Sequence, residues 1–192
     1  MKSRLCNLAV LLAAIGLCWA MMVTKPHYAD LIAPIPLHAT MQETVTARTF
    51  GIHVDKVTFA RALQAEHFGE PKLLTTGGVW AIVAVSLSAN GTSTTVGEAV
   101  WRGPTGLDYR MTERVGFSPG LPPHAVEPGL PKRGLFVFEI PPDQIEGATL
   151  IVAGRRFTPL DSEAMIAIDD VPLDAAGDPR DVVGIYDVSE PI

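Results

Sequence analysis

The stretch GGVWAIVAVSLSANGTS, residues 77–93, decides the fold. Apolar residues at every second position form one of its faces: Val79, Ala81, Val83, Val85 and Leu87. Trp80 and Ile82 make the opposite face apolar as well, before polar residues begin at Ser86. A run that is apolar on both faces is typical of a strand covered on both sides, so we expect a central strand here.

The chain on the C-terminal side of this stretch continues with strand patterns. Asn90-Gly91 favours a tight hairpin turn, because both residues tolerate positive φ angles, and the hairpin would lead into a strand at 94–103. In GLDYRMTERVGF the apolar residues Leu107, Tyr109 and Met111 alternate with charged ones, which predicts a half-buried strand. The Pro/Gly-rich segment 118–133 is expected to be a long loop.

The stretch GLFVFEIPPDQIEGATLIVA, residues 134–153, predicts two further strands with a proline corner between them. The first strand has Phe136, Phe138 and Ile140 on one side and Leu135 and Val137 on the other. The second begins at Leu150 and Val152. A last alternating segment has its apolar residues on one side: Ala164, Ile166 and Ile168.

Residues 44–60, on the N-terminal side of the central stretch, predict one or two strands. Ile52 and Val54 have even numbers, whereas Val57 and Phe59 have odd numbers, so in a regular strand the two pairs would lie on opposite faces. An extra residue near Asp55-Lys56, which would form a β-bulge, would place all four on the same face. Residues 61–70 have a helix-forming composition and predict a short helical turn.

The strand patterns together predict an all-β fold. They amount to seven or eight short strands separated by turn signals, with 17 glycines and 16 prolines scattered between the apolar runs. This is the pattern of an immunoglobulin-like antiparallel β-sandwich, which we place at 44–170. An acidic C-terminal tail at 171–192 is expected to follow it.

The N-terminus predicts a membrane segment. Residues 1–4 contain Lys2 and Arg4 and form a basic region, and residues 5–23 are almost entirely apolar. Nineteen residues of helix span roughly 28 Å, close to the roughly 30 Å thickness of the hydrocarbon core. We therefore favour a single-pass transmembrane signal-anchor that contacts membrane lipid, with residues 1–4 cytoplasmic and the domain outside the cytoplasm. The alternative is a cleaved signal peptide that leaves a secreted or periplasmic protein.

Residues 24–43 contain three prolines and no sustained period, which predicts a stalk between the membrane and the domain. An edge strand in part of this segment is the alternative. Cys6 and Cys18 both lie in the apolar segment, so the domain itself contains no cysteine and no internal disulfide.

Charge and motifs argue against several classes of function. A formal net charge of −6 speaks against nucleic-acid binding. The five histidines (His27, His38, His53, His67 and His124) include no pair at the i, i+4 spacing of a zinc-binding helix. No G-x-S-x-G elbow and no phosphate-binding loop occurs. We therefore expect no catalytic residues, no metal site and no cofactor.

Two surfaces are candidates for binding another protein. If Trp101 is exposed beside the loop at 118–133, it forms a contact site with Pro122 and His124 of that loop. The alternative places Trp101 in the core, the usual fate of an aromatic residue on an alternating strand. The second surface is the apolar run at 182–188, with Val182, Ile185 and Tyr186, which either completes the domain's own sheet or adds to a partner's sheet.

The order of a valine-rich strand ending in SANG, then GLDYRM, EPGLPKRGLFVFEIP and ATLIVA, resembles a bacterial immunoglobulin-like domain-of-unknown-function family found on envelope lipoproteins and membrane-anchored proteins. The resemblance covers about 44–153. A glycine and a tyrosine in the middle strand and a Pro-Gly turn before the aromatic strand match it: Gly106, Tyr109, Pro128 and Gly129. The family implies a fold and a location, and it has no established catalytic residues to transfer.

The sequence therefore predicts a membrane-anchored β-sandwich that acts outside the cytoplasm as a binding or scaffold module for another envelope protein. The alternative function is a small extracytoplasmic enzyme or metal-dependent hydrolase whose acidic and histidine side chains converge only in space.

Overall fold

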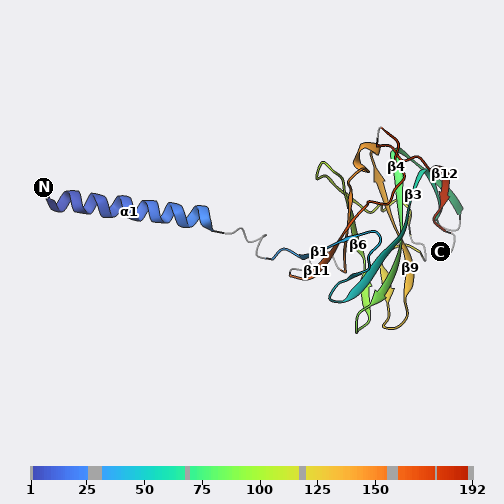
Figure 1. Cartoon of the computed structure of the whole chain (residues 1–192), viewed down its shortest axis with the longest axis horizontal. Coiled ribbons are helices and arrows are strands. Elements are labelled where there is room, and N and C mark those ends of the chain that lie inside the picture. Colours follow the sequence, from blue (N-terminus) through green and yellow to red (C-terminus); the bar gives the residue numbers. More distant parts are fainter. Residues whose placement is uncertain are drawn as a thin grey trace. The chain divides into compact units, whose positions relative to one another are not determined.

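The computed structural model describes residues 2–25, 32–67, 70–116, 120–154, 160–175 and 177–189. The chain divides into two units, Met1–Ala33 and Pro34–Ile192. The first unit contains helix α1 (Lys2–Thr24), in which Cys6–Thr24 is long and apolar enough to cross a membrane (Figure 1). The chain thus has the N-terminal apolar helix that the sequence predicts.

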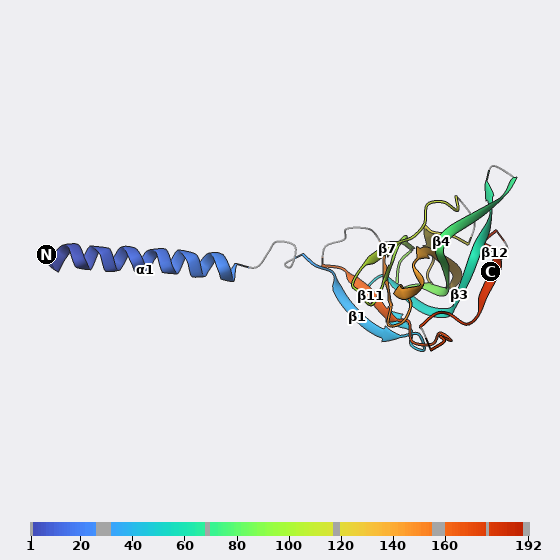
Figure 2. The same cartoon turned by 90° about the horizontal axis from the view of Figure 1, so that it is seen from above.

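The second unit is a β-sandwich, which confirms the predicted fold class. One sheet has the strand order β1 (Ile35–Thr40), β11 (Ser162–Ala167), β10 (Thr149–Ala153), β6 (Glu98–Arg102), β7 (Asp108–Arg110). The other has the order β12 (Val182–Asp187), β3 (Phe50–His67), β4 (Glu70–Ala89), β9 (Lys132–Ile140), with β2 (Val45–Thr46) also on β3. Figure 2 shows β1 and β11 on one side of the sandwich and β3, β4 and β12 on the other.

Two smaller elements complete the sandwich. Strands β5 (Thr94–Val96) and β8 (His124–Val126) form a two-stranded ribbon. A 3-10 turn η1 (Pro142–Gln144) follows β9. Neighbouring strands are antiparallel except for two edge pairs, β1 with β11 and β12 with β3, which are parallel.

The two faces of the second sheet are buried in different clusters. Val79, Val83 and Leu87 of β4 join Phe136 and its neighbours in the main core between the sheets. The opposite faces form a second cluster on the outside of this sheet, which includes Trp80, Ile82, Leu135 and Val137. β4 lies between β3 and β9, so the predicted central strand is confirmed, as are the predicted faces of the strand at 134–140.

The bulge predicted near Asp55-Lys56 is also confirmed. The pairing of β3 with β4 shifts its register between Val54 and Lys56, and it shifts a second time between Ala60 and Ala62. These shifts keep Val54 and Phe59 on the core side of the same strand.

The helical turn predicted at 61–70 is wrong. β3 continues to His67 and pairs residue by residue with the start of β4, for instance Leu63 with Leu74. Both leucines are buried in the outer cluster. Burial and ladder pairing thus outweigh the small differences in helix propensity on which the prediction relied. Residues 68–69 lie outside the described part.

The hairpin predicted at Asn90-Gly91 is wrong as well. Gly91 has a φ of +91°, so the chain does turn there, but β5 pairs with β8 and β6 belongs to the other sheet. The physical reason is that β3 and β9 already occupy both edges of β4, so the chain crosses between sheets. The described part of the predicted loop at 118–133 likewise contains strand β8.

Candidate functional site

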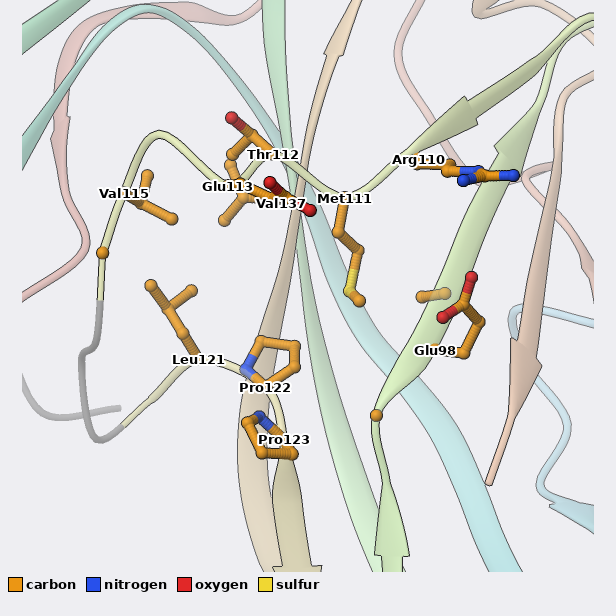
Figure 3. Close-up of a pocket in the computed structure, with 13 residues that line it drawn as sticks. Glu98, Arg110, Met111, Thr112, Glu113, Val115, Leu121, Pro122, Pro123 and Val137 are labelled. Atoms are coloured by element: carbon orange, nitrogen blue, oxygen red, sulfur yellow. The ribbon is translucent and has the colours of Figure 1, made fainter. Parts of the chain in front are cut away.

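A pocket of about 370 Å³ opens where three separate segments meet along the β9 edge of the second sheet (Figure 3). Its walls are the start of β6 with the residue before it, the end of β7 with the chain that follows it, and the turn before β8. The lining residues are Gly97, Glu98, Ala99, Arg110, Met111, Thr112, Glu113, Val115, Gly116, Leu121, Pro122, Pro123 and Val137. The volume lies in the range of small-ligand sites and of pockets that accept an amino-acid side chain.

The inner surface of the pocket is apolar. Val115, Leu121 and Val137 are buried and belong to the outer cluster on the second sheet. Met111 packs against the main core, and Figure 3 shows its side chain pointing between the walls. The pocket therefore lies over the junction of both hydrophobic clusters.

The wall at 111–115 is fixed to the second sheet by several contacts. The Thr112 N–H donates to the Val137 carbonyl oxygen at 2.9 Å. The Arg114 guanidinium donates to Glu139 at 2.9 Å and to the Thr75 carbonyl oxygen at 3.0 Å. It also lies over the Trp80 ring, 5.1 Å from the ring centroid.

The wall at 120–124 is fixed by backbone pairing and by a buried histidine. The Leu135 N–H donates to the Gly120 carbonyl oxygen at 2.7 Å. The His124 ring is fully buried, with Nε2 3.3 Å from the Leu135 carbonyl oxygen and the ring packed edge-on to Phe136. Because both walls are braced on β9, the pocket exists without a ligand.

The mouth of the pocket is polar and carries charges of both signs. Glu98, Arg110 and Glu113 stand around the apolar interior (Figure 3). Among the described residues, those that line the pocket include no histidine, cysteine or serine. Among the residues that the structure describes, no group of three histidine, cysteine or acidic side chains could hold a metal ion.

The first candidate surface from the sequence is only partly present. Trp101 is fully buried, donates its indole N–H to the Gln144 carbonyl oxygen at 2.8 Å, and lies between Phe59 and Phe138. It therefore cannot contact a partner at the surface, and the alternative that places Trp101 in the core is correct. His124 is also buried, so only Pro122 reaches the pocket.

The second candidate surface is β12, at the opposite edge of the second sheet. The strand pairs in parallel with β3, which is the intramolecular alternative for this run. Ile185 is 58% exposed and Val183 is 38% exposed, whereas Val182 and Tyr186 are partly buried against the core clusters. The fold thus separates the candidate residues into a pocket and a strand edge that do not meet.

Two other histidines, His38 and His53, are described and do not line the pocket. His38 is exposed on β1, and Nδ1 of His53 lies 3.3 Å from the Glu43 carbonyl oxygen. His27 and the side chain of His67 lie outside the described residues. The sequence did not reveal the pocket because its walls come from three distant segments, and only the Pro/Gly-rich loop gave a signal.

Burial of His124 predicts a loss of stability in acid. Desolvation lowers the pKa of His124 to about 4, with the nearby charge of Lys132 adding to it and the bond to Leu135 opposing it. The unfolded chain has an ordinary pKa near 6.5, so it takes up the proton first as the pH falls. The contribution of this pKa difference to the free energy of unfolding is complete above pH 6.5 and is lost as the pH falls towards 4. The loss is about 2 kcal/mol between pH 7 and pH 4.5.

Denaturant unfolding of the full-length chain in detergent at several pH values measures this loss. His124→Gln should flatten the pH dependence between pH 7 and pH 4.5, whereas His38→Gln on the exposed edge should leave it unchanged. Equal slopes in all three proteins would contradict the role of His124.

Comparison with known proteins adds evidence on the fold. No protein-family model matches the chain, and no curated protein sequence matches it. Among solved structures, the secreted protein MPT63 of Mycobacterium tuberculosis is 14% identical with a TM-score of 0.50, covering 69% of this chain and 98% of that chain. At this identity the likeness shows the β-sandwich fold alone.

Two further solved structures align at lower scores. An uncharacterized β-sandwich protein from Clostridium difficile is 12% identical with a TM-score of 0.45, covering 76% of this chain and all of its own. The yjhA protein of Bacillus subtilis is 14% identical with a TM-score of 0.47, covering 68% of this chain and 99% of its own.

Proposed function

We propose that this chain is a single-pass membrane protein whose sandwich lies outside the cytoplasm and binds another protein of the cell envelope, without catalysis of its own. The resemblance to the envelope immunoglobulin-like family stays a prediction that agrees with this role.

The location is supported by the N-terminal helix. Basic residues precede its apolar stretch, and this arrangement retains the N-terminus in the cytoplasm and exports the chain beyond the helix. The secreted protein MPT63 provides an example of a similar fold outside a cell. Cleavage after the apolar stretch would leave the same domain outside, so the binding role is independent of anchoring.

The braced pocket is the observation that carries the binding role. Protein interfaces concentrate their affinity where an apolar side chain of one partner fills a pocket of the other, with polar groups around it. The interior around Met111, Val115 and Leu121, with Glu98, Arg110 and Glu113 at the mouth, has this arrangement. Because the walls at 111–115 and 120–124 are already held on β9, binding would not require them to become ordered.

One experiment tests location and binding together. Cys6 and Cys18 are replaced by alanine, and Glu113→Cys introduces a single thiol at the pocket mouth. A membrane-impermeant maleimide photo-crosslinker is then applied to intact cells of the source organism. We expect labelling from outside and, after irradiation, one cross-linked envelope protein. Leu107→Cys, 57% exposed and outside the pocket, is the matched control that labels without forming this product.

Filling the pocket should abolish the cross-link. Gly97 lines the pocket, and a Cβ there would make an ordinary contact of 3.6 Å with Pro123. Gly97→Ala should therefore be tolerated, whereas Gly97→Leu adds three more carbons to the wall and should reduce the cross-linked product at least tenfold. Thermal unfolding of both variants checks that the sandwich is intact. Labelling only after cell lysis would contradict the location, and equal cross-linking from position 107 would contradict the pocket.

A further inference from the structure

Strand β12 leaves one edge of the second sheet open. Its register on β3 is constant from Val182 opposite Phe59 to Asp187 opposite Gln64. The Val188 N–H donates to the Gln64 carbonyl oxygen at 3.0 Å, so residue 188 directs its backbone groups towards β3. Backbone direction alternates along a parallel ladder, and the amide and carbonyl groups of Val183 and Ile185 therefore point away from β3. No strand within the described ranges pairs with them.

The side chains of the same residues form one row. Val183, Ile185 and Asp187 share a face of β12, and Asp181 directly precedes the strand at the matching position. The row reads acidic, apolar, apolar, acidic. Val183 and Ile185 are 38% and 58% exposed, so this row faces solvent.

The acidic group at the C-terminal end of the row, Asp187, is held in its charged form by its neighbours. Hydrogen bonds from the hydroxyl and backbone N–H of Ser189, joined by one from Gln64, hold the pKa of Asp187 below its ordinary value. Asp181 lines a second, smaller pocket beside β3 together with Asp55, Lys56 and Asp170. The basic residues Lys56 and Arg61 belong to β3, one strand in from the edge, and so lie outside the row that an added strand would meet.

The centre of this edge lacks the features that usually prevent pairing. Exposed edges are normally blunted by lysine, proline or a bulge within the strand, and Val182 to Tyr186 contains none of these. Pairing with a second copy of the chain is disfavoured by charge. Asp181 and Asp187 are symmetric about Gly184, so two copies paired antiparallel through this edge would place Asp181 of each copy opposite Asp187 of the other.

We propose that the open edge of β12 accepts an extended segment of a partner protein in which basic residues flank two alternating apolar residues, as in Lys-x-Val-x-Ile-x-Lys. Main-chain hydrogen bonds to Val183 and Ile185 hold the segment, the apolar side chains cover the exposed ones of β12, and the basic residues meet Asp181 and Asp187. This inference rests on the proposed binding function and adds a second contact with its own chemistry.

The test uses the full-length chain in detergent micelles and a fluorescent peptide, Lys-Thr-Val-Thr-Ile-Thr-Lys, with binding followed by anisotropy. We expect saturable binding. Ile185→Pro removes an N–H that points away from β3, so the sheet retains its own ladder while the peptide affinity falls at least tenfold. Ile185→Leu is the matched control and should bind as the parent chain does. Thermal unfolding confirms that both variants are folded.

A charge exchange tests the pattern. Asp181→Lys should weaken binding of the lysine peptide about threefold or more and strengthen binding of the same peptide with glutamates at both ends. Methylation of alternate peptide nitrogens should abolish binding, because it removes the main-chain donors. Equal binding by the parent chain and Ile185→Pro, no binding at all, or dimerisation of the chain through β12 would each overturn the proposal.

The result is separable from the proposed function. If the peptide does not bind but the cross-link at position 113 still forms, the proposed strand contact is refuted and the proposed binding function is retained. Peptide binding without any cross-linked envelope protein would support the edge chemistry and contradict the pocket.

Discussion

Gly78→Ala should destabilise the sandwich by about 3 kcal/mol or more, because a Cβ at this position meets backbone that cannot move freely. It would lie 2.2 Å from the Ile140 carbonyl oxygen and 3.0 Å from its carbonyl carbon. Ile140 is the residue of β9 that pairs with Val79, so relief of this clash would separate the central strand from its neighbour. Disrupting a buried ladder is among the few changes that cost this much.

The neighbouring glycine provides the control. A Cβ at Gly77 would have no atom within 4 Å and the residue has no positive φ, so Gly77→Ala should change the free energy of unfolding by less than about 1 kcal/mol. Denaturant unfolding of the two variants in detergent gives both values. Similar stabilities for Gly77→Ala and Gly78→Ala would show that β4 and β9 do not approach as closely as described.

Trp101→Ala should cost about 3–5 kcal/mol of stability, since it removes the largest side chain from the centre of the main core. The ring packs edge-on to Phe59 at 6.4 Å and tilted to Phe138 at 6.0 Å, so it joins both sheets. Its indole N–H also satisfies the Gln144 carbonyl oxygen in the turn after β9.

Trp101→Phe separates packing from hydrogen bonding. It retains much of the ring contact but leaves a buried carbonyl oxygen without its donor, which costs about 1–3 kcal/mol. We expect the order of stability to be parent, Trp101→Phe, Trp101→Ala in unfolding followed by circular dichroism. A Trp101→Ala protein as stable as the parent would mean that this side chain is exposed, as the surface-contact interpretation required.

The predictions from sequence succeeded where local pattern and burial agree. β4 is apolar on both faces because both are covered, and alternation at Phe136 to Ile140 reflects two clusters on one strand. The bulge at Asp55-Lys56 could be predicted because the apolar residues change there from even to odd positions, and such a change has few other physical causes.

The wrong predictions concern which segments of the chain pair with each other. Residues 61–67 could have formed a turn of helix, and only their contact with the start of β4 selects a strand. The turn at Asn90-Gly91 is real, but its local chemistry does not show that both edges of β4 are occupied.

The candidate site was harder to predict for the same reason. His124 is buried because Gly134 leaves room for its ring: a Cβ there would lie 2.5 Å from Cε1. That fit depends on a residue of β9 and not on the proline-rich loop itself. The pocket likewise needs 97–99, 110–116 and 121–123 together, and the sequence does not show which of these segments meet.

The two parallel edge pairs determine when each sheet can be completed during folding. Ile35, at the start of β1, pairs with Ser162, and β3 pairs with β12, the last strand described. Neither sheet has all its strands until the C-terminal part of the chain has been synthesised. A chain that leaves the ribosome N-terminus first must therefore wait with two sheet edges unoccupied, exposed to proteases and to neighbouring chains, until its last strands arrive.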